Sequence, residues 1–199
     1  MNRSPLRWIP LLGALALAPS LPITAAEATV MTALSLDDMA RGADVIARGE
    51  IVEQKSAWIE RRIYTVTRLK ITESLKGSHK AGDVISIRQL GGTVDGISQQ
   101  IAGNARLAVG EEVALFLKSD PEKDLHYVMG MAQGKYAIDR SSGAPRAVRQ
   151  LSGISLSRPG VRQLAKAHEI AERGTPWPDL KAQIQGALQA PAATPAPAP

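Results

Sequence analysis

The sequence predicts a mainly β protein. Between residues 43 and 138, apolar side chains alternate with polar ones over several short runs, which is the pattern of half-buried strands. Clusters of glycine and aspartate separate the runs and favour turns, because glycine adopts positive φ angles and aspartate caps its own backbone. The sequence contains no cysteine, so this region must be stabilised by packing and not by disulfide bonds.

The alternation also places the individual strands. The longest run, residues 62–75, puts Ile63, Leu69 and Ile71 on one face, and its length is typical of a curved strand. The other expected strands are 43–55, 84–90, a short one around 97–101, 112–118, and a hairpin-like pair made of 127–131 and 135–138. The side chains expected to face the interior are Ile63, Leu69, Ile71, Ile85, Ile87, Val113, Leu115 and Leu117.

Helical patterns flank the β region. Ser35 is a suitable N-cap for a short helix that ends at Gly42. After the β region, residues 161–173 and 179–188 carry apolar side chains at helical spacing, which predicts two further short helices. The last residues, 190–199, alternate alanine with proline, and we expect a disordered tail.

The N-terminus has the pattern of a secretory signal peptide. Two arginines precede the uncharged apolar run of residues 8–21, and small residues follow it. Cleavage after Ala26 is favoured over cleavage after Ala28, which makes residues 1–26 the signal peptide. The apolar run of about 14 residues is shorter than the roughly 20 that span a bilayer, so we expect a soluble exported chain. Export without cysteine favours a periplasmic or secreted bacterial protein.

The net charge of +5 is concentrated near the C-terminus. Residues 141–189 hold seven basic and three acidic side chains, so the β region is close to neutral. We interpret the basic segment as a solvated helix face, with weak contact to an anionic surface as the alternative. Aromatic residues make up only 4% of the chain, and only Tyr64 with Arg68 and Lys70 approaches a stacking surface, so no specific nucleic acid partner is expected.

The sequence contains no recognisable catalytic motif. His168 is followed by Glu169, but Glu172 stands where a zinc protease helix needs its second histidine. Gly153, Ile154 and Ser155 do not continue into the nucleophile elbow of a serine hydrolase. The histidines His79 and His126 lie in expected turns, where surface placement is usual. We therefore expect no enzyme activity, no metal site and no cofactor.

Several segments carry a resemblance to known proteins. They are Ala43-Asp44-Val45-Ile46, Ile63-Tyr64-Thr65 through Leu75-Lys76-Gly77, Gly91-Gly92, Gly110-Glu111-Glu112 before Leu115-Phe116-Leu117, and Gln133-Gly134-Lys135-Tyr136. Together they resemble a widespread group of uncharacterised exported bacterial β-barrel proteins. The opening order is also similar to that of the inhibitory domain of tissue inhibitors of metalloproteinases, an OB-like barrel of the netrin type. Those inhibitors chelate the protease zinc through an N-terminal cysteine, which this chain lacks. The resemblance implies the barrel and not the inhibition mechanism.

We therefore expect an OB-like barrel of five or six strands over residues 41–140. A helix and linker (27–40) precede it, and a basic helical segment (141–189) and the tail (190–199) follow it. The expected function is that of an exported, non-enzymatic binding module for a protein partner such as an exported protease. The alternative is an envelope-associated structural protein that contacts anionic surfaces through its basic segment.

The longest connection, residues 91–110, is the expected recognition surface, because binding residues concentrate on long loops held by a rigid sheet. Its candidate binding residues are Asp95, Gln99, Gln100, Asn104 and Arg106. The alternative is that this segment only closes the barrel.

Overall fold

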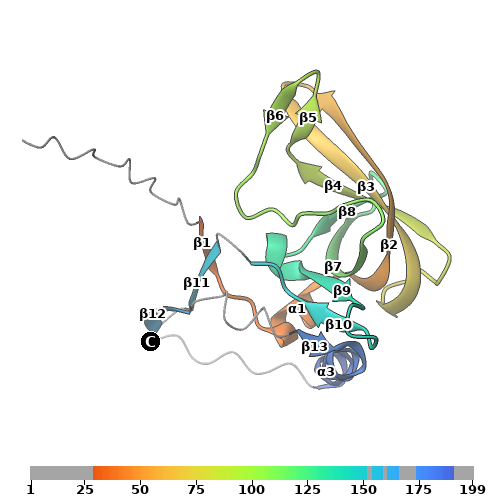
Figure 1. The fold of residues 1–199 in the computed structure, drawn as a ribbon, viewed down its shortest axis with the longest axis vertical. Helices are drawn as coiled ribbons and strands as arrows, with labels where there is room; N and C mark the ends of the chain where they lie inside the picture. Colours follow the sequence, from red (N-terminus) through yellow and green to blue (C-terminus); the bar gives the residue numbers. More distant parts are fainter. Residues whose placement is uncertain (1–28, 152–153, 159–160, 166–173, 191–199) are drawn as a thin grey trace, which may run out of the picture.

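The computed structural model describes residues 29–151, 154–158, 161–165 and 174–190 (Figure 1). The expected signal peptide lies outside the described residues, as does the expected tail from residue 191 onward. Residues 166–173, the second half of an expected helix, also lie outside them.

Five strands of one sheet form a closed ring. They are β2 (Val45–Ile59), β3 (Arg62–Lys76), β4 (Val84–Leu90), β7 (Glu112–Asp120) and β8 (Leu125–Val128). The ring runs in the order β2, β3, β4, β8, β7 and back to β2. Neighbours are antiparallel except β4 and β8, which are parallel and pair at Ile87 and His126. The prediction of a mainly β fold is therefore confirmed.

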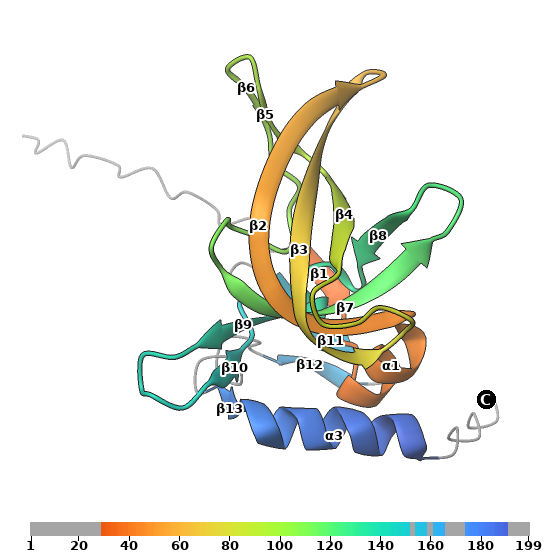
Figure 2. The ribbon, with the colours of Figure 1, turned by 90° about the vertical axis from the view of Figure 1, so that its right-hand side faces the viewer.

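The hairpin of β2 and β3 extends well beyond the ring. Each strand has 15 residues, and the pair curves away from the rest of the sheet (Figures 1 and 2). The pairing of β2 with β3 has three register shifts between Ile46 and Glu53, which mark bulges that increase the local bend. The expected strand 43–55 was too short, because β2 continues to Ile59. Its last residues lie mostly exposed on both faces, so they carry no alternation that would reveal a strand.

The sheet also extends from the edge of β7. The strands β9 (Lys135–Asp139), β10 (Arg146–Val148) and β13 (Thr175–Pro176) follow one another outward from it. The expected hairpin of 127–131 with 135–138 is wrong, because β8 and β9 both pair with β7 and not with each other. A 3-10 turn, η1 (Met131–Gly134), separates them. It starts at Gly130 and Met131, whose positive φ angles of 63° and 57° turn the chain along the edge of β7.

The interior of the ring is apolar. The eight side chains expected to face inward are all buried, with exposed fractions of 0 to 4%. Their burial is therefore confirmed, and all of them except Ile63 belong to the apolar cluster that fills the ring. A second core lies on the other side of β7, where Phe116 packs with Met39 of α1 (Leu36–Gly42) and with Ile184 of α3 (Trp177–Gln189). The helix α1 begins at Ser35 with a capping box to Asp38, as its sequence indicates.

Only one of the two expected C-terminal helices is present among the described residues. α3 covers the predicted helix 179–188. In residues 161–165 the chain instead forms the strand β12 (Val161–Ala165), which pairs with β11 (Ile154–Arg158). β11 in turn runs parallel to β1 (Thr29–Thr32). The sequence between β11 and β12 is Pro159-Gly160, a strong turn signal that the apolar spacing had masked.

A charged cluster fastens α3 to the ring. Glu73 of β3 accepts hydrogen bonds from the Trp177 indole at 3.0 Å and from Lys181. Arg48 of β2 lies between Glu73, at 3.8 Å, and Glu112, at 2.6 Å. Burial would raise the pKa of Glu73, but the hydrogen bonds from Lys181 and Trp177 and the charges of Lys181 and Arg48 hold it below its usual value. Among the described residues, no helix is long and apolar enough to cross a membrane.

Candidate functional site

A cleft of about 1080 Å³ is lined in part by the β2–β3 hairpin. The hairpin forms one wall, and the segment of residues 99–107 forms the opposite one. Between them lies the small hairpin of β5 (Gly92–Val94) and β6 (Ile97–Gln99). The lining is Gln54, Ser56, Thr65, Gln89, Leu90, Gly91, Gly92, Thr93, Ser98, Gln99, Gln100, Ile101, Ala102, Gly103, Asn104, Ala105, Arg106, Leu107, Ala132, Lys135, Gln150 and Ile154.

Two glycines let β5 approach this wall closely. Gly92 has a φ of 140°, and a Cβ there would lie 2.3 Å from the hydroxyl oxygen of Thr65 and 2.5 Å from that of Ser56. The two hydroxyls are 2.8 Å apart, and Thr65 donates to the carbonyl oxygen of Gly91 at 2.7 Å. The Gly91-Gly92 pair is therefore required where the backbone passes over polar side chains of β2 and β3.

Side chains from the sheet hold the opposite wall in place. Gln54 donates to the carbonyl oxygen of Leu107 at 3.1 Å, and Gln89 donates to that of Ala105 at 3.0 Å. The side chains of Ala105 and Leu107 are themselves buried in the ring core. Ala105 and Leu107 therefore contribute to the ring core and also line the cleft.

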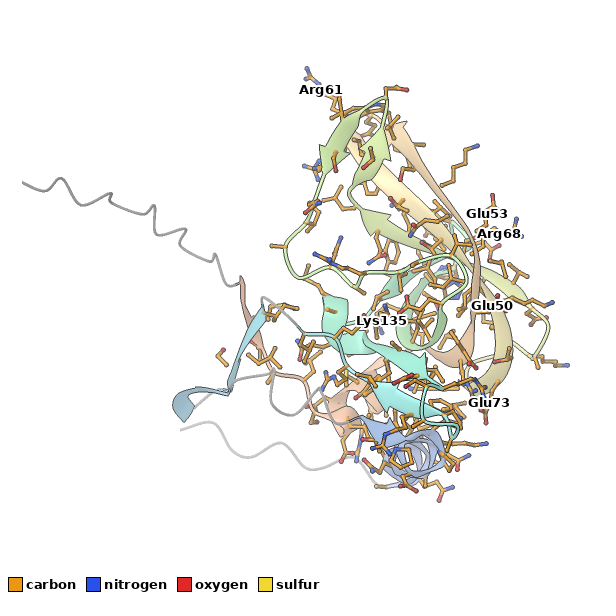
Figure 3. All side chains as sticks on the ribbon, viewed as in Figure 1. Glu50, Glu53, Arg61, Arg68, Glu73 and Lys135 are labelled. Atoms are coloured by element: carbon orange, nitrogen blue, oxygen red, sulfur yellow. The ribbon has the colours of Figure 1, made fainter. Side chains whose placement is uncertain are left out.

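Lys135 lies at the base of this wall, in the middle of the molecule (Figure 3). Only 3% of the residue is exposed, and its ammonium group contacts Glu111 at 2.6 Å and Gln150 at 3.2 Å. It also donates to the carbonyl oxygen of Arg106. Burial lowers the pKa of Lys135, while the hydrogen bond and the charge of Glu111 oppose that effect. Through these buried contacts, Lys135 links β9 to the wall of the cleft.

The structure brings four of the five candidate binding residues together. Gln99, Gln100, Asn104 and Arg106 all line the cleft. Gln100 and Arg106 are exposed, whereas Gln99 accepts a hydrogen bond from the backbone N–H of Ile63 and Asn104 donates to the carbonyl oxygen of Leu90. Asp95 does not line the cleft. It is exposed in the turn between β5 and β6, with a φ of 52°.

Sequence reasoning missed the part of the cleft that the strands provide. Ser56, Thr65 and Gln89 line it from β2, β3 and β4. Thr65 lies on the face of β3 that carries Ile63 and Leu69, where alternation predicts a core. Polar side chains at positions where alternation predicts a core could have indicated this part of the cleft. Burying a polar group without a hydrogen-bonding partner costs free energy, so such a group is expected to have a role.

The cleft is suited to hydrogen bonding more than to acid–base chemistry. Its polar groups are amides, hydroxyls and backbone atoms, and its charged side chains are Arg106 and Lys135. Among the described residues of the lining there is no histidine, aspartate or glutamate. Within the described part of the chain, no group of three or more His, Cys, Asp or Glu side chains is arranged to hold a metal ion.

A smaller cleft of about 310 Å³ lies beside the loop of residues 77–83. His79 and His126 line it together with Asp44, Asp120 and Asp124. The expected surface placement of His126 is wrong, since it is 5% exposed and sits within β8. It was assigned to a turn because the sequence before it, Asp120 to Asp124, is strongly turn-forming and β8 is only four residues long.

No model of a protein family matches the chain, and no curated protein is significantly similar to it.

Proposed function

We propose that this chain is an exported binding module without catalytic activity, which recognises a protein partner, such as an exported protease, through the larger cleft. The observation that carries the proposal is the hydrogen-bonding lining of that cleft. Exposed Gln100 lies there with the hydroxyls of Ser56 and Thr65 and the backbone of Gly91. Amide and hydroxyl groups of this kind match the donors and acceptors of an extended peptide backbone.

Apolar anchors next to the cleft support a protein partner over a small molecule. Trp58 and Ile59 near the end of β2 are 45% and 40% exposed, and Ile97 at the end of the β5–β6 hairpin is 55% exposed. The two hairpins end at the same side of the molecule (Figures 1 and 2). Large exposed side chains around a polar groove are common in protein interfaces, where aromatic anchors contribute much of the affinity.

The charge at this end points to an acidic partner surface. Arg61 in the connection from β2 to β3 and Arg62 at the start of β3 are exposed, and Figure 3 shows Arg61 at the far end of the hairpin. Arg106 adds a third positive charge at the cleft. Because opposite charges steer association, a partner with carboxylates around an exposed segment fits this surface best.

The connectivity of the ring supports an OB-like barrel as its fold. If the five strands are numbered along the chain, their order around the ring is first (β2), second (β3), third (β4), fifth (β8) and fourth (β7). The chain therefore crosses after β4 to the other side of β2, where it forms β7. Such a Greek-key connection in a five-stranded ring is typical of OB folds, which bind ligands on strand faces and flanking loops. The long connection that carries residues 99–107 is one of these crossings.

The alternative, contact with anionic surfaces through the basic C-terminal segment, has less support. Arg149 donates to the carbonyl oxygen of Gln133 and lies 5.3 Å from the ring of Tyr136. Lys181 is engaged by Glu73, and Arg146 donates to the carbonyl oxygen of Gly174. These cationic side chains make contacts within the protein, so they are less available to bind an external surface.

The test is site-specific photo-crosslinking in the native periplasm. A crosslinking amino acid replaces Gln100 at the cleft or, as the matched control, Gln185 on the exposed face of α3. We expect one protein to be crosslinked from position 100 and none from position 185. Crosslinking to the same protein from both positions, or to lipid alone, would reject the cleft as the recognition surface.

A further inference from the structure

Two histidines that are 47 positions apart in the sequence meet beside the smaller cleft. The Nε2 atoms of His79 and His126 are 3.3 Å apart, and the two rings are inclined at 65°. β8 holds His126 in place, because this residue pairs with Ile87 of β4 on one side and with Ser119 of β7 on the other. His79 comes from the loop between β3 and β4, and 26% of its side chain is exposed.

The outer nitrogens of both rings face oxygen atoms. Nδ1 of His126 is 3.3 Å from the carbonyl oxygen of Ser86, which can only accept a hydrogen bond. The proton of neutral His126 therefore belongs on Nδ1, and its Nε2 carries a lone pair directed at His79. Nδ1 of His79 is 4.0 Å from the carboxylate of Asp83. Histidine ligands of metals commonly donate their second N–H to a carbonyl or carboxylate, and the contact of His126 with Ser86 matches this arrangement, whereas His79 and Asp83 are too far apart for a hydrogen bond.

The distance between the two Nε2 atoms fits a shared ion. Two imidazole nitrogens that bind one tetrahedral zinc at its usual bond length lie about 3.3 to 3.4 Å from each other. The observed separation is 3.3 Å. A direct N–H···N hydrogen bond between the rings is the competing explanation, and it predicts no affinity for metal.

The surroundings suit a cation. The cleft of about 310 Å³ has room for water ligands, and carboxylates of Asp44, Asp120 and Asp124 line it. Asp124 is exposed at the mouth, whereas Asp44 and Asp120 are engaged by Lys118 and Lys123. The charge of Asp124 favours a cation, and none of the three carboxylates needs to become a ligand.

We propose that His79 and His126 together bind one divalent transition-metal ion, such as Zn²⁺, with water completing its coordination. The site is separate from the larger cleft and does not depend on the proposed binding function. With two protein ligands it is an open site, so it binds metal more weakly than closed four-ligand zinc sites do.

The experiment is calorimetric titration of the metal-free full chain with Zn²⁺ at pH 7.5. His79→Gln is the test variant, and His168→Gln is the matched control because His168 is the third histidine of the sequence. We expect one Zn²⁺ per chain in the wild type and in His168→Gln. In His79→Gln the affinity should fall by more than the roughly tenfold that loss of an outer-shell partner costs.

A second measurement on the wild type removes the dependence on variant folding. Nitrogen NMR of the histidine side chains should show that Zn²⁺ shifts the Nε2 resonances of His79 and His126 and leaves those of His168 unchanged. The proposal is overturned if the wild type does not bind Zn²⁺ saturably, if His79→Gln binds it equally well, or if only the His168 resonances respond.

Discussion

The two halves of the β2–β3 hairpin belong to one antiparallel strand pair and differ in the side chains that they place on the same face. In the half that belongs to the ring, Ile51 pairs opposite Leu69 and both are fully buried. In the projecting half, Ser56 pairs opposite Thr65, and both line the larger cleft. The comparison shows that backbone hydrogen bonds can maintain the pairing of two strands past the residues that pack in the core. Side-chain chemistry then decides which part is interior and which part is available for recognition.

The largest contrast is expected between truncations in the two halves. Leu69→Ala removes a fully buried side chain from the ring and should lower the free energy of unfolding by about 2 to 5 kcal/mol. Ser56→Ala removes one hydrogen bond to Thr65 and should cost about 1 kcal/mol. Urea denaturation of both variants measures the difference. Equal losses would show that the projecting half is as much a part of the core as the ring.

A glycine tests the close approach of β5 to the hairpin. Gly92→Ala places a Cβ within 2.3 Å of the Thr65 hydroxyl at a φ of 140°, so we expect a loss of about 1 to 3 kcal/mol. The control is Gly96→Ala, which also has a positive φ but meets nothing within 4 Å. Its cost should be smaller, about 1 kcal/mol from backbone strain alone. Thermal unfolding of the pair would contradict the described packing if the control were the less stable variant.

Lowering the pH should decrease the free energy of unfolding through protonation of Glu73, which lies in the half of the hairpin that belongs to the ring. Its pKa is lowered in the folded state, because the hydrogen bonds and charges of Lys181, Trp177 and Arg48 outweigh the raising effect of burial. A lowered carboxyl pKa stabilises the fold above the unfolded value of 4.5, and this contribution is lost as the pH falls through the folded value. We expect the free energy of unfolding to decrease below about pH 4.5.

The matched variant for this effect is Glu73→Gln, which keeps the shape and removes the titration. It should be less stable than the wild type at pH 7 and should lose less on acidification. Trp177 donates to Glu73, so its fluorescence reports the same contact. Parallel pH curves for the two proteins would mean that Glu73 contributes nothing to the acid response, leaving Glu112, whose pKa is also lowered, as its source.

The smallest stability effect is expected in the wall of the cleft. Gln100→Ala combined with Arg106→Ala changes two exposed side chains and should alter the free energy of unfolding by less than about 0.5 kcal/mol, while it weakens binding of the crosslinked partner. Gln99→Ala should cost about 1 kcal/mol, because it leaves the N–H of Ile63 without its acceptor. Deletion of residues 191–199 should change neither property. Loss of binding on that deletion alone would move the recognition surface to the C-terminus.

Strand alternation predicted the ring interior well because burial acts on single side chains. Strand alternation did not predict pairing, because the partner of a strand depends on residues that are distant in the sequence. The segments that form β8 and β9 are close in sequence, yet η1 places them end to end along β7, and no local pattern shows which edge a short strand will join. In residues 161–165, five residues are too few to separate a helical period from an alternating one.

The candidate site was predictable only in its loop. A long, glycine-rich connection can be recognised from its composition. Four of the five candidate binding residues in it line the cleft. Ser56 and Thr65 lie on strands with regular alternation, and the sequence does not show that β2 continues past the core. Their role depends on how far the hairpin projects, which is a property of the whole fold.

β7 is the strand on which both cores depend. Leu115 and Leu117 point into the ring, while Ala114 and Phe116 point toward α1 and α3. Opening β7 would expose both hydrophobic layers at once and would break pairing with β2, β8 and β9. Ring and helical layer should therefore unfold in a single cooperative step, with the amide protons of β7 among the last to exchange with solvent. The last residues of β2 in the projecting hairpin are mostly exposed, so their amide protons should exchange with solvent before those of β7.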